Sequence, residues 1–313
     1  MSFQEKLREG LYDSEGRPRL VYARSYFQQF GLDENSGLKE LKEYYREWRD
    51  FDEYFIFQKQ LTDPKKIGEV ERETIASKSA KRGNDVYNWR LDKRLRFLDE
   101  LKSLTLFDPH SSSKRSNVIF ATLTYDVNRS SVQEATETVG LDYNNWIRNL
   151  RKKFGRVSCF RCWKASKKGY LHIHVLLVFH DYEFKISFSQ LKGSRMVYRV
   201  EEKEEFEKGW HSFVDVQAVR ELRQGIRYVT KYLAKTRSES QIQDLTLALC
   251  WLFRKRTFAV SGDFLEELKM KIKSLGINRL VQINLQGETL TSNVEYVRIG
   301  FFSANRLGID RNE

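Results

Sequence analysis

The spacing of apolar residues along the chain changes from helical to strand-like near residue 117. From 38 to 61, leucines and aromatic residues recur at helical spacing, which predicts a helix, and Asn84 can cap a second helix that continues to about residue 106. Runs rich in β-branched and large apolar residues predict strands at 118–125, 156–163, 169–179 and 210–219. With a further helix at 141–154, the pattern predicts an α+β fold built on a central antiparallel sheet with flanking helices.

A polar linker separates the helical part of the chain from the strand-rich part. Residues 108–116 combine a proline with a run of serines, which is typical of a linker. We therefore predict a helical accessory region with its linker at 1–116 and a core at 117–237. Residues 238–313 form a predicted C-terminal α/β extension, with helices at 242–252 and 264–275 and strands at 279–285 and 294–302.

Two histidines on one predicted strand are the first candidates for chemistry. The short basic stretch at 164–169 predicts a hairpin turn, so the strands on either side of it should pair antiparallel. Because side chains on a strand alternate between faces, His172 and His174 project from the same face and can share one metal ion. By themselves they are equally compatible with two half-exposed histidines that satisfy polar neighbours.

Two tyrosines follow about fifty residues later on a predicted helix at 226–235. Tyr228 and Tyr232 are spaced i, i+4, so they lie on one face of that helix, with Lys231 beside the second tyrosine and Lys235 one turn further on. The alternative interpretation is an amphipathic core helix with tyrosines at its rim.

The charge balance favours a polyanionic partner. The 313 residues contain 55 Lys and Arg against 43 Asp and Glu, which gives a net charge of +12 and a pI near 9.4. Basic side chains displace counterions from phosphates, although charge alone is not specific for nucleic acid. The basic residues predicted to contact DNA are Arg151, Lys152, Lys153, Lys167, Lys168 and Lys235.

Composition also excludes several classes of protein. No apolar stretch approaches the ~20 residues needed to cross a bilayer, and the N-terminus lacks a secretory pattern, so we expect a cytoplasmic protein with no membrane partner. Three cysteines argue against a disulfide framework, and Cys159 and Cys162 supply only half of a zinc site. No phosphate-binding loop of the Gly-x-x-x-x-Gly-Lys-Ser/Thr type occurs, so unwinding of DNA would need a separate helicase.

Taken in order, three motifs resemble those of the HUH endonucleases. They are Phe120-Ala121-Thr122-Leu123-Thr124-Tyr125, His172-Ile173-His174 and Tyr228-Val229-Thr230-Lys231-Tyr232. The paired tyrosines are similar to those of the two-tyrosine rolling-circle replication initiators (Rep proteins) of plasmids and small single-stranded DNA viruses. The resemblance implies an RRM-like nuclease core at 117–237 that binds single-stranded DNA at a replication origin, at a hairpin, and works with a separate helicase and polymerase.

The resemblance also implies the chemistry. His172 and His174 would hold Mg²⁺ or Mn²⁺, a tyrosine would attack the scissile phosphate to form a 5′-phosphotyrosine, and Lys231 would assist. Many members carry a carboxylate ligand shortly before the histidine pair, where this chain has Lys164, Ala165 and Ser166. Asp215 or Gln217, which share one face of the strand before the tyrosine helix, could supply the missing oxygen, and Asp126 is a further option.

Two alternative functions remain open at this point. A single-strand DNA transposase of the same superfamily would share every catalytic residue named above and differ only in the DNA that it cuts. A non-catalytic nucleic-acid-binding module would use aromatic and basic residues without a covalent step. By analogy with single-tyrosine initiators, in which the tyrosine precedes a lysine by three positions, we predict Tyr228 as the first nucleophile.

Overall fold

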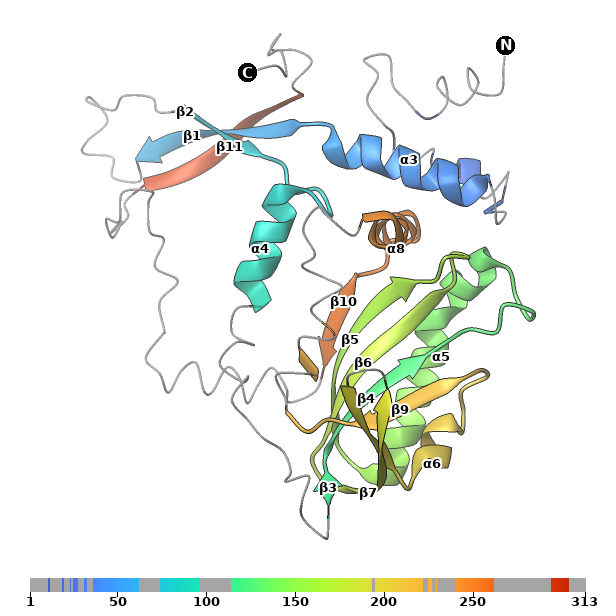
Figure 1. The fold of residues 1–313 in the computed structure, drawn as a ribbon. Coiled ribbons are helices and arrows are strands. Elements are labelled where there is room, and N and C mark those ends of the chain that lie inside the picture. The colour runs from blue at the N-terminus through green and yellow to red at the C-terminus, as the bar shows by residue number, and fades with distance from the viewer. Residues whose placement is uncertain are drawn as a thin grey trace.

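The computed structural model describes most of the central part of the chain and portions of both ends (Figure 1). The described residues are 11, 19, 23, 25–27, 31–32, 36–61, 74–95, 114–192, 195–221, 225–226, 229, 240–261 and 294–303. The predicted helix at 264–275 and the predicted strand at 279–285 lie outside these residues, as does the predicted continuation of the second helix from 96 to 106.

An antiparallel sheet of eight strands forms the centre of the molecule, in the order β10-β5-β6-β4-β9-β8-β7-β3. The strands are β3 Arg115–Ser116, β4 Val118–Leu123, β5 Val157–Ala165, β6 Leu171–Phe179, β7 Phe184–Lys192, β8 Arg195–Val200, β9 Val214–Ala218 and β10 Phe258–Ser261. The predicted α+β class is confirmed. The hairpin of β7 and β8 was not predicted, because polar and basic residues are interspersed among its apolar residues and leave no continuous apolar run.

The turn between β5 and β6 is tight and basic, as the sequence predicts. The Ser166 N–H donates to the Tyr170 carbonyl at 2.9 Å, and Gly169 adopts a φ of +87°. A side chain at position 169 would be strained in this backbone region and would meet Leu38 at 2.7 Å. The turn leaves Lys167 and Lys168 exposed at the end of the sheet where β6 begins.

One face of the sheet, the first face, is covered by the long helix α5 (Val132–Phe154) and the short helix α6 (Lys203–Glu207). The helix α5 begins well before the predicted residue 141, because Ser131 and Glu134 form a capping box that satisfies its first turn. The buried Trp146 packs on this face and donates its indole N–H to the Phe206 carbonyl at 2.7 Å. Most of the hydrophobic core lies between α5 and the first face.

The opposite face, the second face, carries a smaller hydrophobic cluster. Sheet residues and three residues from other segments make up this cluster: Val118, Phe120, Phe160, Cys162, Leu176, Val219, Leu91, Ile226 and Val229. Leu91 belongs to α4 (Asp85–Leu95), and Tyr87 of the same helix bonds Thr257 beside β10 at 3.1 Å. The predicted cap of this helix is confirmed, since Asn84 Oδ1 accepts the Tyr87 N–H at 2.9 Å.

A separate three-stranded sheet joins the two ends of the chain (Figure 1). It consists of β1 (Glu53–Leu61), β2 (Thr74–Lys78) and β11 (Val294–Ser303), in the order β11-β1-β2. The helix predicted at 38–61 is therefore wrong from residue 51 onward: α3 runs from Gly37 to Asp50, and a strand begins at Glu53. The consecutive aromatic and β-branched residues from Tyr54 to Phe57 favour a strand, and pairing with β11 secures it.

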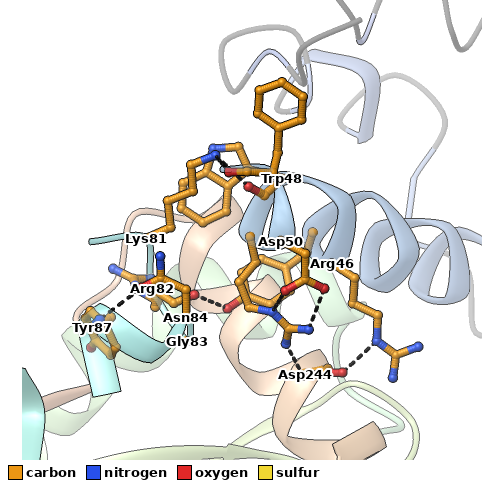
Figure 2. A network of polar contacts seen from close by, with 12 residues as sticks. Arg46, Trp48, Asp50, Lys81, Arg82, Gly83, Asn84, Tyr87 and Asp244 are labelled. Carbon is orange, nitrogen blue, oxygen red and sulfur yellow. Dashed lines mark hydrogen bonds and ion pairs between the residues drawn. The ribbon is translucent and has the colours of Figure 1, made fainter. Parts of the chain in front are cut away.

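The helices α3 and α8 (Ser240–Leu252) are locked together by a polar network (Figure 2). Asp244 of α8 has a side chain only 9 % exposed and accepts from Arg46 Nε at 2.6 Å and Arg49 Nη1 at 2.9 Å. Lys81 closes the end of α3 by donating to the Trp48 and Phe51 carbonyls at 2.9 and 2.6 Å. The ring of Trp48 also packs 5.2 Å from Trp251 of α8, so the N-terminal region is an integral part of the fold.

The predicted helix at 242–252 and the predicted strand at 294–302 are confirmed as α8 and β11. Among the residues that the structure describes, no helix has both the length and the apolar character that a membrane span requires.

Replacing Asp244 by Asn should destabilise the protein more than replacing Asp50 by Asn, although both carboxylates bond Arg49. Asp244 is largely buried and holds two arginines, so its loss should lower the free energy of unfolding by about 2 kcal/mol or more. The Asp50 side chain is 58 % exposed, and its loss should cost less than about 1 kcal/mol. Guanidinium denaturation of both variants measures the difference. Equal losses of unfolding free energy would show that the buried ion pairs of Asp244 stabilise the fold no more than the exposed pair of Asp50.

Candidate active site

The two histidines lie on β6, an interior strand flanked by β5 and β4, and both project from the second face of the sheet. Their ring centroids are 5.3 Å apart with planes at 81°. His174 is 4 % exposed, and its Nδ1 lies 3.1 Å from Oγ1 of Thr122, the residue directly opposite on β4. This contact fixes the orientation of the second imidazole, and the half-buried His172 lies nearer the open end of the face.

Burial keeps both imidazoles neutral. Burial and the charge of Lys164 lower the pKa of His172 to about 4, and burial together with His172 and Lys164 lowers the pKa of His174 to about 3. Lys164 acts on them because it stands directly opposite His172 in the pairing of β5 with β6. Neutral imidazole is the form that binds a metal ion, so the pair is in its ligating state throughout the physiological pH range.

A row of directly opposed residues crosses the second face through His174. Cys162 on β5 faces His174, His174 faces Thr122 on β4, and Thr122 faces Asp215 on β9. The register therefore brings the histidine pair and the candidate third ligand into line, which the sequence alone did not reveal.

The chain on either side of Tyr228 is anchored to the same face. Ile226 and Val229 are buried in the second-face cluster, and Cys162 Sγ lies 3.5 Å from the Val229 carbonyl as a hydrogen-bond donor. Gly225 allows the close approach, since a Cβ there would lie 2.7 Å from Leu176 Cδ1 on β6. The backbone of Val229 thus contacts Cys162, which is opposite His174 in the pairing of β5 with β6.

The proposed nucleophiles and their lysines are not among the described residues. Tyr228, Lys231, Tyr232 and Lys235 all lie outside them. Tyr228 directly precedes Val229 in the sequence, and the Val229 carbonyl contacts Cys162, the residue opposite His174. This contact is the described link between the sequence around Tyr228 and the histidine pair.

The candidate third ligands share the face of the histidines but have other partners. Asp215 contacts Arg199 through one carboxylate oxygen and accepts the Gln217 amide at 2.6 Å through the other. Two strand spacings, about 10 Å, separate Asp215 from His174 at the backbone. Asp126 is occupied by Arg129 at 3.3 Å. Across the described part of the chain, no group of three His, Cys, Asp or Glu residues is placed to hold a metal ion.

The donor set nevertheless fits a divalent ion in part. Two neutral imidazoles at one end of an open face can occupy two coordination positions, and the remaining positions require oxygen atoms. Water and the phosphate of a substrate can supply these. The described residues therefore supply two ligands of a Mn²⁺ or Mg²⁺ site, and two imidazoles with water alone hold these oxygen-preferring ions weakly.

The predicted DNA-binding residues fall into two groups. Lys167 and Lys168 are exposed in the turn beside the start of β6, at the same end as His172. Arg151, Lys152 and Lys153 end α5, which covers the first face, so the sheet separates them from the histidines. Arg151 donates to the Val157 carbonyl at 3.1 Å and Lys153 pairs with Glu205 at 2.5 Å.

Sequence analysis missed the supporting residues of the site. Thr122 holds the ring of His174, Cys162 holds the backbone of Val229, and Gly225 sets the approach to β6. Thr122 lies within the first motif, which was a usable signal. The contacts of Cys162 and Gly225 follow from strand register and helix docking, which leave no local mark in the sequence.

Residues 118–237 match the model of a protein family described as Replication-associated protein ORF2. The match covers less than half of the 313 residues and runs from the first residue of β4 through the tyrosine motif. It supports a replication protein of the initiator type, with DNA as its partner. No curated protein matches the chain significantly.

The lowered pKa values predict a pH dependence of stability in the metal-free protein. An unfolded histidine has a pKa of about 6.5, so below this pH the unfolded chain binds protons that the folded chain excludes. The free energy of unfolding should be highest above pH 6.5 and should decrease as the pH is lowered towards 4, by up to about 1.4 kcal/mol per pH unit for each histidine.

Denaturation at a series of pH values measures this slope, with His172→Gln as the comparison. The variant retains only one of the two histidines, so its slope should be clearly shallower than that of the wild type. Equal slopes would show that His172 does not titrate as its burial requires.

Proposed function

We propose that the protein initiates rolling-circle replication by nicking and rejoining single-stranded DNA through a covalent tyrosine intermediate that depends on a divalent metal. One observation carries this proposal: the residues that flank Tyr228 are packed on the face of the sheet that presents His172 and His174. A DNA-binding module needs neither a neutral histidine pair nor a tyrosine segment docked beside it. The family match at 118–237 supports the replication role.

In this proposal the histidines bind a divalent ion and so direct it at the scissile phosphate. The ion, when bound, neutralises charge that develops on the phosphate oxygens. The fixed ring of His174 and the more open ring of His172 would define where that phosphate lies. Lys164, opposite His172, lies in the stretch 164–166 where many HUH endonucleases carry a carboxylate, and its positive charge would hold a phosphate oxygen.

Tyr228 would be the attacking group. Its phenolic oxygen forms a bond to phosphorus while the bond from phosphorus to the 3′ oxygen breaks, and the phenolic proton is balanced by protonation of that oxygen to a 3′-OH. A phenol with a pKa of about 10 is mostly protonated at neutral pH, so a nearby cation is needed, and Lys231 fits that role by sequence. The free 3′-OH can then prime DNA synthesis.

Tyr232 would complete the cycle. At i, i+4 on a helix the two tyrosines would be about 5–6 Å apart at Cβ, close enough to address one phosphate in turn. The second tyrosine would cleave after a round of synthesis, and the strand would pass from one tyrosine to the other. Unwinding would come from a separate helicase, because the sequence contains no phosphate-binding ATPase loop.

A search for a covalent adduct tests the proposal directly. Full-length protein is incubated with a diverse pool of single-stranded DNA and Mn²⁺, denatured, and analysed by mass spectrometry. We expect DNA linked through its 5′ phosphate to Tyr228 or Tyr232, and sequencing of the linked DNA would separate a replication origin from transposon ends. Tight DNA binding without any adduct would refute the enzymatic function.

His172→Ala and His174→Ala should each abolish adduct formation while largely sparing DNA binding, because they remove metal ligands and no charge. His180→Ala is the matched control, since His180 follows the far end of β6 and bonds Ser158 at 2.7 Å. It should form adduct at the wild-type rate. Normal cleavage in either of the first two variants would eliminate the metal site.

Tyr228→Phe should prevent the initial nick, whereas Tyr232→Phe should still nick and fail in the second transfer. The substitution removes one hydroxyl and keeps the ring, so folding is preserved. Gel analysis of a labelled single-stranded substrate, followed by addition of a second strand, distinguishes the two steps. If Tyr232→Phe alone blocks the first nick, the order of the tyrosines is reversed.

A further inference from the structure

Phe213 is an exposed aromatic residue held rigidly at the edge of the candidate site. Its side chain is 61 % exposed, among the highest values for large hydrophobic residues in the described part of the chain. Both the N–H and the hydroxyl of Thr124 donate to the Phe213 carbonyl, at 3.1 and 3.0 Å. The Thr124 carbonyl in turn accepts the indole N–H of Trp210 at 2.8 Å, so the residue that holds the Phe213 carbonyl is itself held in place.

The pairing of the strands places Phe213 on the histidine side of the sheet. Val214 is buried against the first face, so alternation assigns Phe213 and Asp215 to the second. On β4, Leu123 is opposite Ile173 of β6 on one side and Val214 of β9 on the other. One residue further towards this end of the sheet, Phe213 is therefore level with His172. Two strand spacings, about 10 Å, separate the two backbones.

The charge around this edge suits a polyanion. Lys164 stands opposite His172, and Lys167 and Lys168 are exposed in the adjoining turn. The carboxylates nearby are neutralised, because Asp126 pairs with Arg129 at 3.3 Å and Asp215 contacts Arg199. An exposed aromatic ring at the same end of the sheet as exposed lysines is a combination that binds single-stranded nucleic acid, with stacking for bases and positive charge for phosphates.

We propose that Phe213 is a base-stacking platform, on which a nucleobase of single-stranded DNA rests while a neighbouring phosphate lies at His172 and His174. The proposal rests on the function proposed above and adds a specific contact to it. Stacking on an aromatic ring tolerates any base, since every base has a π face. Phe213 would thus position the strand for cleavage without selecting its sequence.

Binding to two oligonucleotides of equal charge tests the proposal. Fluorescence anisotropy of the full-length protein, in EDTA to prevent cleavage, compares oligothymidylate with an oligonucleotide of the same length made of abasic sites. Phe213→Ala should weaken binding to oligothymidylate about tenfold and leave binding to the abasic strand unchanged. The dependence of affinity on salt should keep its slope, because no charge is removed.

Two variants serve as controls. Leu141 is 64 % exposed on α5, over the opposite face, so Leu141→Ala should bind both oligonucleotides as the wild type does. Phe213→Trp should retain the affinity for oligothymidylate, and the fluorescence of the new indole should be quenched when this strand binds.

Unchanged affinity of Phe213→Ala for oligothymidylate, or an equal loss on both strands, would overturn the stacking role. The measurement is independent of cleavage. Loss of base-dependent affinity in a protein that forms no adduct would leave the stacking contact standing and remove the proposed enzymatic function. Adduct formation with no effect of Phe213→Ala on binding would support the enzymatic function and remove the stacking contact.

Discussion

The antiparallel pairing of β6 between β5 and β4 is the constraint on which the rest of the structure depends. Ile173, Val175 and Leu177 are fully buried against α5 on the first face, and each contributes about 1.5–3 kcal/mol relative to an exposed position. A slip of one residue would turn these side chains outward and drive the histidines into the main core. The apolar residues of β6 therefore determine the direction of His172 and His174, and their burial outweighs the cost of desolvating two imidazoles.

The second face of the sheet is covered only in part. Leu176 and Phe120 are buried beneath Ile226, Val229 and α4, whereas His172 retains access to solvent. The boundary between covered and open surface runs beside the histidines. Burial lowers the pKa values of both imidazoles and keeps them neutral, while His172 stays partly exposed to solvent. The hydrophobic contacts that close one part of the face include Ile226 and Val229, which lie on either side of Tyr228 in the sequence.

Segments from the two ends of the chain stabilise each other and the central sheet. β1 pairs with β11 across more than two hundred residues of sequence, and α3 packs on α8 through Asp244. The helix α4, which belongs to the N-terminal region, contributes Leu91 to the cluster on the second face. The described part of the predicted N-terminal accessory region thus contacts the strand that carries the histidines, because Leu91 shares a cluster with Leu176 of β6.

The sequence by itself determined what depends on local pattern. The strand periodicity around His172 and His174, the apolar spacing of α8 and the cap at Asn84 each reside in a few consecutive residues, and the structure agrees with all three. The helix predicted through Tyr54 to Phe57 was wrong, because the helical spacing of apolar residues was given more weight than the strand preference of this aromatic and β-branched run. Pairing with β11 and β2 secures the strand. Tertiary structure alone decided which distant residues meet. Thr122 supports His174, Cys162 contacts Val229, and Phe213 comes level with His172, because strand register and helix docking arise from the burial of many side chains together. No short stretch of sequence encodes such a pairing. The candidate residues of the site were therefore visible in its motifs, whereas the geometry around the histidines depends on the packing of the whole sheet.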